Sequence, residues 1–442
     1  MAQALPTADG YRGIWYYNQP SGDEYVYKYS GGFATYPQQH VPIAHYRPEV
    51  GKTFFVYGGT VEGERELMHM VSYYDHAAGT VPRPTVLLNK HTDDAHDNPT
   101  LSIDTEGYLW IFSNAHGTSR PSYIHRSDRP YDVTAFERVA VTNFSYGQPW
   151  YVHDRGFLFL HTRYAPGRCL HWMTSPDGRA WSEPRRLAAV GEGHYQISWQ
   201  NGERVGTAFN YHPDDAAVNG LNARTNLYYL ETRDLGRTWQ TVNGQPVATP
   251  ILNVMNEALV RDYRSQGLLV YLKDMAFDAR GHPVLLYITS KGYESGPAND
   301  PRTWTTARWT GSEWAVRPVT TSDSNYDYGP LIIEPDGVWR VVAPTEPGPQ
   351  RYNPGGEVVL WISRDQGETW TRARQLTARS AYNHTYVRKP VNAHPEFYAL
   401  WADGHARQPS ASRLYYTDRE SSHVWELPST MSGDVARPRV AW

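Results

Sequence analysis

Two histidines that lie twenty residues apart are the first candidates for chemistry in this sequence. His96 lies in a polar run just before a strand-like segment at residues 100–103, and His116 follows a second such segment at residues 108–113. A hairpin formed by these segments places both imidazoles at the same end. Two histidines that titrate near neutral pH can serve as an acid and a base. We therefore predict that His96 and His116 form a catalytic pair.

The elements that must position this pair are repeated along the chain. A short turn ending in tryptophan occurs three times, with Ser or Thr, then Asp, Gly and Trp in each copy. The Asp carboxylate can accept hydrogen bonds from backbone amides of the turn. The Gly can adopt a positive φ, and the Trp can pack on the preceding strand. The copies match the Asp-box, or BNR, motif of sialidase-like propellers. They occupy residues 175–181, 232–239 and 363–370.

A second repeated element precedes these turns. A polar residue three positions before Pro starts a strand-like run, and this position holds Gln39, His96, Tyr146 and Asp327 in the clear copies. Each unit then reads as three strands, an Asp-type turn and a fourth strand. About seven such units predict an all-β fold, a seven-bladed β-propeller of four-stranded antiparallel blades. We expect one domain over residues 1–442, closed by pairing of residues 11–17 with the last blade.

Composition agrees with a turn-rich, aromatic-rich β protein. The 442 residues include 16 Trp, 33 Tyr, 36 Gly and 32 Pro, as expected where β-strands and turns dominate. The net charge of −4 provides no broad basic surface, so no nucleic-acid partner is expected. No apolar run is long enough for a membrane span, and the start lacks the pattern of a signal peptide. The single Cys169 cannot form an intrachain disulfide.

A propeller brings equivalent positions of different blades together at one end of its channel. The position three residues before Pro adds Tyr146 to the histidine pair. The end of the second strand of the following units adds Arg163 or Tyr164 in one unit and Tyr211 in the next. Loops rich in Arg, Asn and Tyr suit a sugar or a carboxylate, because arginine binds carboxylates in a bidentate manner. The candidate binding residues in these loops are Arg224, His384 and Arg388.

A metal site is a further interpretation of the run around His96. Asp93, Asp94 and Asp97 add carboxylates to this imidazole, but neighbouring residues in a strand alternate faces and cannot all bind one ion. We therefore predict no catalytic metal and no required cofactor. A structural divalent cation in the central channel remains compatible with the sequence.

Several runs resemble one group of BNR-type seven-bladed propellers of bacteria and fungi. They are residues 96–99, 113–123, 353–357, 382–388 and 401–405, and the resemblance extends over about residues 11–417. The group acts on L-rhamnose-α-1,4-D-glucuronate caps of arabinogalactan and gum arabic. The chain is also similar, more distantly, to propeller ulvan lyases, which share two His twenty residues apart followed by a Tyr and an Arg. The resemblance places these roles on His96, His116, Tyr146 and Arg163.

Two activities occur in the group that the sequence resembles. Some members are lyases that use the histidine pair, and others are α-L-rhamnosidases that use one His on the opposite face. The candidate for that residue here is His40. The resemblance implies an acidic plant polysaccharide as the partner, a secreted or periplasmic location, and a monomer.

Lyase chemistry can be argued from the residues as well. β-Elimination needs a group that neutralises the uronate carboxylate, a base for H5 and an acid for O4. Arg163 or Arg388, with Asn98, could neutralise the carboxylate. Either histidine could be the base, and Tyr146 or Tyr211 the acid. Hydrolysis normally uses paired carboxylates, and no such pair stands out, so the lyase is favoured over the rhamnosidase.

Two rival functions would need other features. A sialidase needs an arginine triad and a Tyr–Glu nucleophile pair, for which Arg12 is the only early candidate. A carbohydrate-binding propeller without catalysis is the alternative outside the enzymes, and it predicts binding without turnover.

Overall fold

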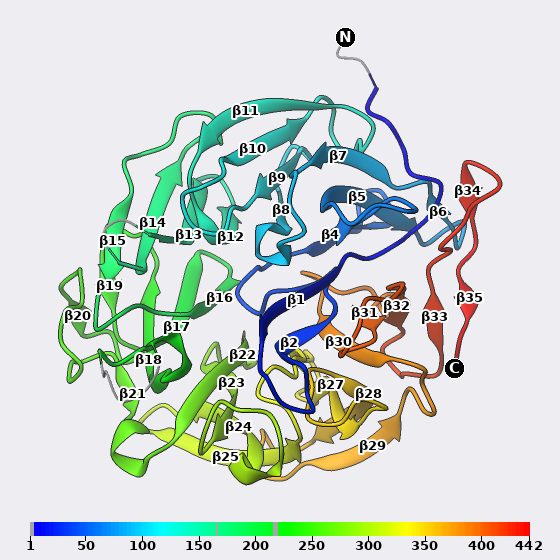
Figure 1. Ribbon diagram of the computed structural model, residues 1–442. Helices are drawn as coiled ribbons and strands as arrows, with labels where there is room; N and C mark the ends of the chain where they lie inside the picture. Colours follow the sequence, from blue (N-terminus) through cyan, green and yellow to red (C-terminus); the bar gives the residue numbers. More distant parts are fainter. Residues whose placement is uncertain (1–3, 165–166, 215–219) are drawn as a thin grey trace.

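Successive antiparallel sheets follow one another around a ring in the computed structural model, which describes residues 4–164, 167–214 and 220–442 (Figure 1). The first sheet has the order β3 (Ala44–Arg47), β4 (Lys52–Gly59), β5 (Met68–Asp75) and β7 (Thr85–Asn89). The second contains β8 (Pro99–Ile103), β9 (Leu109–Ser113), β10 (Ser122–Ser127) and β11 (Phe136–Thr142). The third contains β12 (Ser145–Val152), β13 (Gly156–Arg163), β14 (Cys169–Ser175) and β15 (Arg185–Ala188).

The ring continues with two further separate sheets. One comprises β16 (Gln196–Asn201), β17 (Arg204–Tyr211), β18 (Thr225–Thr232), β19 (Trp239–Gln240) and β20 (Pro246–Val247), with β21 (Leu259–Arg261) beside β18. The next contains β22 (Leu269–Phe277), β23 (Pro283–Ser290), β24 (Arg302–Trp309) and β25 (Trp314–Ser322). Four 3₁₀ helices occur in the described residues: η1 (Ala95–Asp97), η2 (Gly220–Asn222), η3 (Arg264–Gln266) and η4 (Pro297–Asn299).

Nine of the later strands form one sheet. It contains β26 (Leu331–Ile333), β27 (Trp339–Pro347), β28 (Gly356–Ser363), β29 (Thr371–Gln375), β30 (Asn383–Arg388), β31 (Ala399–Gly404), β32 (Leu414–Thr417), β33 (Val424–Glu426) and β35 (Arg439–Val440). Its two halves are joined by a single residue pair, Gly356 with His384. Dividing the sheet at that pair gives the repeated four-stranded unit twice more, β26–β29 and β30–β33. The predicted all-β propeller is confirmed, and its Asp-type turns follow β14, β18 and β28.

The Asp-type turns have the chemistry that their residues predict. Asp365 Oδ1 accepts the backbone N–H of Thr369 at 2.9 Å, and Ser363 Oγ accepts that of Gly367 at 2.9 Å. Gly178, in the turn after β14, has φ +73° and lies against the Trp110 ring of the second sheet. The turn of one sheet therefore packs on the tryptophan of its neighbour, which helps hold adjacent sheets together.

We expect Gly178→Ala to destabilise the protein by about 2 kcal/mol or more, because an added Cβ would overlap Trp110 and the positive φ disfavours alanine. Gly202→Ala is the matched control, since Gly202 has φ +61° but open space around it. Chemical denaturation of both variants measures the difference. Equal losses of stability would show that the contact with Trp110 contributes nothing.

The first and last sheets close the ring by packing and by short bridges. The rings of Phe55 and Phe397 stack with centroids 5.7 Å apart, within a buried apolar cluster that spans both sheets. His45 and Val391 form a parallel bridge. β34 (Val435–Ala436) pairs with β6 (Val81–Pro82), so this late segment lies beside the first sheet (Figure 1).

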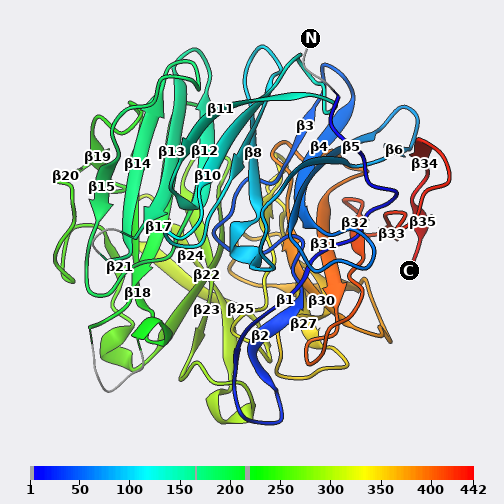
Figure 2. The ribbon, with the colours of Figure 1, turned by 45° about the horizontal axis from the view of Figure 1, so that its top comes forward.

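The segment at residues 11–17 does not join the last sheet as a strand, contrary to the prediction. Instead β1 (Trp15–Pro20) pairs antiparallel with β2 (Tyr27–Gly32) as a separate hairpin. Pairing with a strand close in sequence loses less conformational entropy, because the connecting loop is short. Figures 1 and 2 show this hairpin near the centre of the ring.

The hairpin is seated on the last sheet. Trp15 Nε1 donates to the carbonyl of His405 at 2.8 Å, Ser30 Oγ donates to that of Ala406, and Thr385 Oγ1 donates to that of Gly32. Its inward side carries Tyr16 and Tyr29 toward the channel. In the described parts of the chain, no helix has the length and apolar character needed to span a bilayer.

Candidate active site

The β8–β9 hairpin brings His96 and His116 together, as the sequence predicts. His96 lies in η1 directly before β8, and His116 follows β9 at the same end. Their ring centroids are 4.0 Å apart with an interplanar angle of 21°. Asp94 caps η1 by accepting the backbone N–H of His96 at 3.0 Å. The two imidazoles are therefore stacked at one mouth of the channel.

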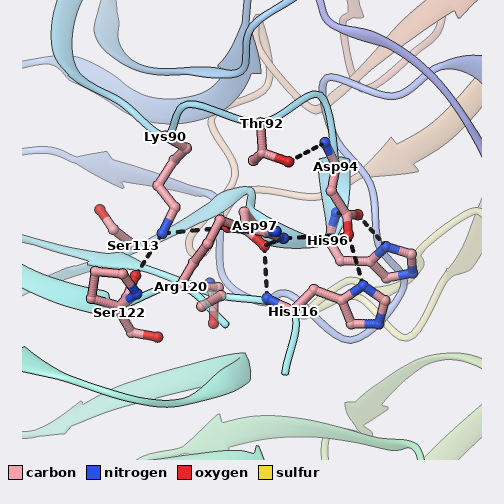
Figure 3. Close-up of polar contacts among 12 residues, drawn as sticks. Lys90, Thr92, Asp94, His96, Asp97, Ser113, His116, Arg120 and Ser122 are labelled. Carbon is pink, nitrogen blue, oxygen red and sulfur yellow. Dashed lines mark hydrogen bonds and ion pairs between the residues drawn. The ribbon is translucent and has the colours of Figure 1, made fainter. Parts of the chain in front are cut away.

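One carboxylate orients both rings. Asp94 Oδ1 lies 2.6 Å from His96 Nδ1, and Asp94 Oδ2 lies 2.8 Å from His116 Nδ1 (Figure 3). Burial raises the pKa of Asp94, but the two histidines outweigh it and hold that pKa well below its usual range. Asp94 therefore stays ionised and accepts an N–H from each Nδ1, so Nε2 is the nitrogen that faces outward from this contact.

The two histidines have different acidities. Burial, together with the charge of His116, lowers the pKa of His96 to about 4. Burial also lowers the pKa of His116, but the hydrogen bond and the charge of Asp94 outweigh it, so the net shift is upward. His96 Nε2 lies 3.1 Å from the Tyr29 hydroxyl, whereas the side chain of His116 is 31% exposed. At neutral pH His116 is the ring that can carry a positive charge toward a ligand.

A buried ion cluster supports this pair from behind. Asp97, which is fully buried, accepts the backbone N–H of His116 at 2.7 Å and the Nε–H of Arg120 at 2.9 Å. Lys90 Nζ lies 3.4 Å from Asp97 (Figure 3). Asp94 and Asp97 are thus positioning residues, and each contacts a histidine rather than the open channel.

Tyr146 reaches the histidines through an irregularity in β12. Its backbone φ is +52°, and the register of β12 with β13 shifts between Ser145 and Gln148. A bulge of this kind re-aims a side chain, and a positive φ at a tyrosine stores strain. The Tyr146 ring lies 6.1 Å from that of His96 and 6.5 Å from that of His116. Burial, then neighbouring tyrosines, raise the pKa of Tyr146 well above 10.

Two arginines face a tyrosine that the sequence analysis did not select. The guanidinium carbons of Arg168 and Arg224 lie 4.1 and 4.4 Å from the centre of the Tyr195 ring. Burial raises the pKa of Tyr195, but the charges of Arg168 and Arg224 outweigh it and lower that pKa to about 7. Tyr195 directly precedes the inner strand β16, within the repeated polar run that starts an inner strand, and this run is the signal that could have found it.

These groups line a cavity of about 310 Å³ at the channel mouth. The β1–β2 hairpin and the loop before β3 supply one part of the wall, η1 and the β9 end a second, and segments between β12 and β26 the rest. Among the described lining residues there is no Asp or Glu, so the cavity combines cationic and phenolic groups. It is lined by Asn18, Gln19, Lys28, Tyr29, Tyr36, Gln38, Gln39, His96, His116, Tyr146, Arg168, Tyr195, Leu221, Asn222, Arg224 and Tyr326.

Of the predicted residues, Arg163 and Tyr211 lie outside this cavity. Arg163 ends β13 opposite Cys169, and Arg168, directly before β14, is the arginine that lines the cavity. The predicted spacing pointed to the connection between β13 and β14, but it selected Arg163 instead of Arg168, which lines the cavity. Tyr211 is 1% exposed and packs in the core, where its hydroxyl accepts from Arg264 at 2.9 Å.

His384, Arg388 and Asn98 also have partners away from the cavity. His384 Nδ1 accepts from Trp401 Nε1 at 2.9 Å inside the last sheet. Arg388 Nε donates to the carbonyl of Thr35 at 2.8 Å, and the Asn98 amide donates to that of Tyr36 at 2.6 Å. Arg388 and Asn98 therefore hold the loop before β3, which contributes Tyr36, Gln38 and Gln39 to the wall.

His40 is buried, and both of its ring nitrogens lack a hydrogen-bond partner within the described structure. Its ring lies 5.8 Å from that of Tyr146, behind the cavity wall rather than in it. Burial, followed by the charge of Arg388, lowers the pKa of His40 well below 6.5. His40 is thus a neutral ring without access to the described cavity.

Asp94, His96 and His116 also have ligand atoms close enough together for a metal ion. In this arrangement, however, both oxygens of Asp94 are used by the two Nδ1 atoms at hydrogen-bond distance. The geometry is that of two imidazoles oriented by a shared carboxylate. The structural channel cation stays a prediction.

The protein is an all-β propeller whose histidine pair lines a cavity at the mouth of the channel. The chain belongs to the BNR repeat-containing family, whose model matches residues 61–322. It is similar to an ulvan lyase, PL25, of Pseudoalteromonas sp. (strain PLSV), with 24% identity over 314 residues, which is 62% of each chain. An ulvan lyase of Alteromonas sp. (strain LOR) is 23% identical over 70% of this chain and 69% of its own length.

Solved structures extend the likeness of fold to nearly the whole chain. A PL25 ulvan lyase superposes with a TM-score of 0.73 at 18% identity, covering 94% of this chain and 96% of that one. A PL25 ulvan lyase structure bound to -[GlcA(1-4)Rha3S]- also superposes with a TM-score of 0.73, at 17% identity. The similarity to propeller ulvan lyases that the sequence predicts is confirmed.

Proposed function

We propose that this protein is a polysaccharide lyase that cleaves the L-rhamnose-α-1,4-D-glucuronate linkage of arabinogalactan and gum arabic side chains by β-elimination. The observation that carries the proposal is Tyr195, a phenol held between Arg168 and Arg224 in a cavity shared with the histidine pair. The ulvan lyase relatives support lyase chemistry, and one of them binds a glucuronate–rhamnose chain. The choice of the rhamnose–glucuronate cap as the substrate rests on the resemblance of the sequence to propellers that act on it.

Elimination begins with the uronate carboxylate. Arg224 and protonated His116 bind it and neutralise its charge, which makes H5 on the adjacent carbon more acidic. His96, neutral and fixed by Asp94 and the Tyr29 hydroxyl, keeps His116 in place from the stacked side. Asp94 maintains the positive form of His116 through its hydrogen bond and its charge.

Two tyrosines complete the reaction. The Tyr195 phenolate, which Arg168 and Arg224 stabilise, removes H5, and the electron pair of that C–H bond forms the C4–C5 double bond as the C4–O4 bond breaks. Tyr146, whose raised pKa keeps it protonated, donates its proton to O4 of the departing rhamnose. In glucuronate H5 and O4 lie on one face of the ring, so base and acid must approach from one side. The rings of Tyr146 and Tyr195 lie 5.6 Å apart in the same cavity, which suits this requirement.

The base in this mechanism is Tyr195 and not one of the two histidines that the sequence predicts. His96 is buried against Asp94 and Tyr29, and His116 is held toward its charged form, so neither is a free neutral base at the cavity surface. Hydrolysis is less well supported, because two carboxylates normally flank a hydrolysed glycosidic bond and the described cavity lining has none. His40, the proposed hydrolase residue, is enclosed by protein.

The direct test is incubation with gum arabic and with a rhamnosyl-glucuronate oligosaccharide. A lyase releases rhamnose together with near-ultraviolet absorbance from the unsaturated uronate. Rhamnose without new absorbance means hydrolysis, and binding without release means a non-catalytic propeller. A parallel assay with ulvan separates the linkage from the polymer: cleavage of ulvan alone would keep the lyase and overturn the arabinogalactan assignment. A polymeric substrate of this kind also supports a secreted or periplasmic location.

A further inference from the structure

A second group of ligating side chains lies where the first and last sheets meet. His76 follows β5, and His394 and Glu396 lie in the loop between β30 and β31. Strands alternate in direction within each sheet, so these positions lie at the end of the ring opposite to the one that carries His96 and His116. None of the three residues lines the cavity described above.

The three side chains converge across more than three hundred residues of sequence. His76 Nδ1 lies 3.2 Å from Glu396 Oε2, with a separation of 320 residues between them. The rings of His76 and His394 have centroids 3.8 Å apart at 46°. One ligand atom from each of the three residues falls within 4.8 Å of the other two. Small movements of the Glu396 side chain, which is 58% exposed, can close this set around an ion.

Neighbouring groups orient the two imidazoles. Thr53 Oγ1 lies 2.9 Å from His76 Nε2, and when that nitrogen carries the proton its N–H donates to the hydroxyl. The lone pair of Nδ1 then points at the Glu396 carboxylate, and a cation between them is the natural partner of both. His394 Nδ1 accepts the backbone N–H of Glu396 at 3.2 Å. Coordination by His394 exchanges this contact for a metal bond, since a neutral imidazole has one lone pair.

We propose that His76, His394 and Glu396 bind a divalent transition-metal ion that joins the first and last sheets of the ring. Two imidazoles and one carboxylate match the donor set that Zn²⁺ takes in proteins, with water in the fourth position. They do not match Ca²⁺ or Mg²⁺, which prefer oxygen ligands throughout. Because the ligands come from the first and last sheets, the bound ion would hold these two sheets together and stabilise the closed ring.

The test uses the full chain without a polyhistidine tag, and Zn²⁺ as the probe. We expect one Zn²⁺ per chain after equilibrium dialysis, and a Tm that rises by about 3 °C when free Zn²⁺ is about 100-fold above Kd. Chelation should return the Tm to its starting value. Lyase activity on gum arabic should not change, because the site lies away from the cavity, so this result is separable from the proposed function.

Variants assign the binding to these residues. His394→Gln and Glu396→Gln should each lose the bound Zn²⁺ and the Tm increase, and Glu396→Gln, at an exposed side chain, should still fold. His153→Gln is the matched control, since His153 is an exposed histidine 2.7 Å from the carboxylate of Asp154 without a second imidazole. It should keep full binding. Zn²⁺ retained by Glu396→Gln at the level of the unchanged protein, or no Zn²⁺ retained by the unchanged protein, would overturn the proposal.

Discussion

Tyr195→Phe should lower kcat on a rhamnosyl-glucuronate substrate by about 10²–10⁴-fold, the range that a general base contributes. The substitution removes only the hydroxyl and keeps the ring between Arg168 and Arg224. Substrate binding should change little, so the loss should appear in kcat rather than in KM. The rate of absorbance increase from the unsaturated product measures it. Tyr108→Phe, at a tyrosine outside the cavity, should retain full activity.

The pH profile provides an independent check on the same residue. Tyr195 acts in its deprotonated form, and its pKa is lowered to about 7, so kcat/KM should rise as the pH increases through that value. Arg168→Met removes one of the two charges responsible and should move the rising limb to higher pH. A profile that is flat between about pH 6 and 8 would contradict a tyrosine base with this acidity.

His116→Gln should lower kcat/KM by about 10²–10³-fold, because the cavity loses the cationic ring that neutralises the uronate carboxylate. Asp94→Asn should cause a smaller loss by the same route: without the carboxylate, the pKa of His116 falls and less of the ring is charged. Steady-state kinetics near neutral pH measure both effects.

The double variant tests whether Asp94 acts through His116. If it does, Asp94→Asn combined with His116→Gln should be no slower than His116→Gln alone. Losses that multiply would instead give Asp94 a role of its own, for example through His96, which it contacts at 2.6 Å. Circular dichroism of each variant controls for misfolding, since Asp94 also caps η1.

The fold was accessible from the sequence because its signals are local and repeated. The turns at Asp177, Asp234 and Asp365 carry their own hydrogen-bonding chemistry, and each follows a strand close to the predicted position. The histidine pair was accessible for the same reason, since one hairpin joins His96 to His116.

The rest of the site depends on contacts between sheets. Tyr195 is chemically distinctive only because Arg168 and Arg224, from different strand connections, lie against it. Arg168 rather than Arg163 lines the cavity, and strand periodicity does not specify which of the two does so. His384 lies in a loop-like polar run of the sequence, yet it is enclosed by Trp401, Tyr415 and Trp442.

The seating of the β1–β2 hairpin links the proposed active site to the last sheet of the ring. Every described residue that lines the cavity lies before β26, yet Tyr29 contacts His96 from a hairpin anchored on the carbonyls of His405 and Ala406. During synthesis, the first strands must therefore wait until His405 and Ala406 have been made before they reach their final place. A truncated chain that ends before β30 would contain all the cavity residues and still have an unsupported wall. The proposed activity thus requires the last sheet of the ring to be in place.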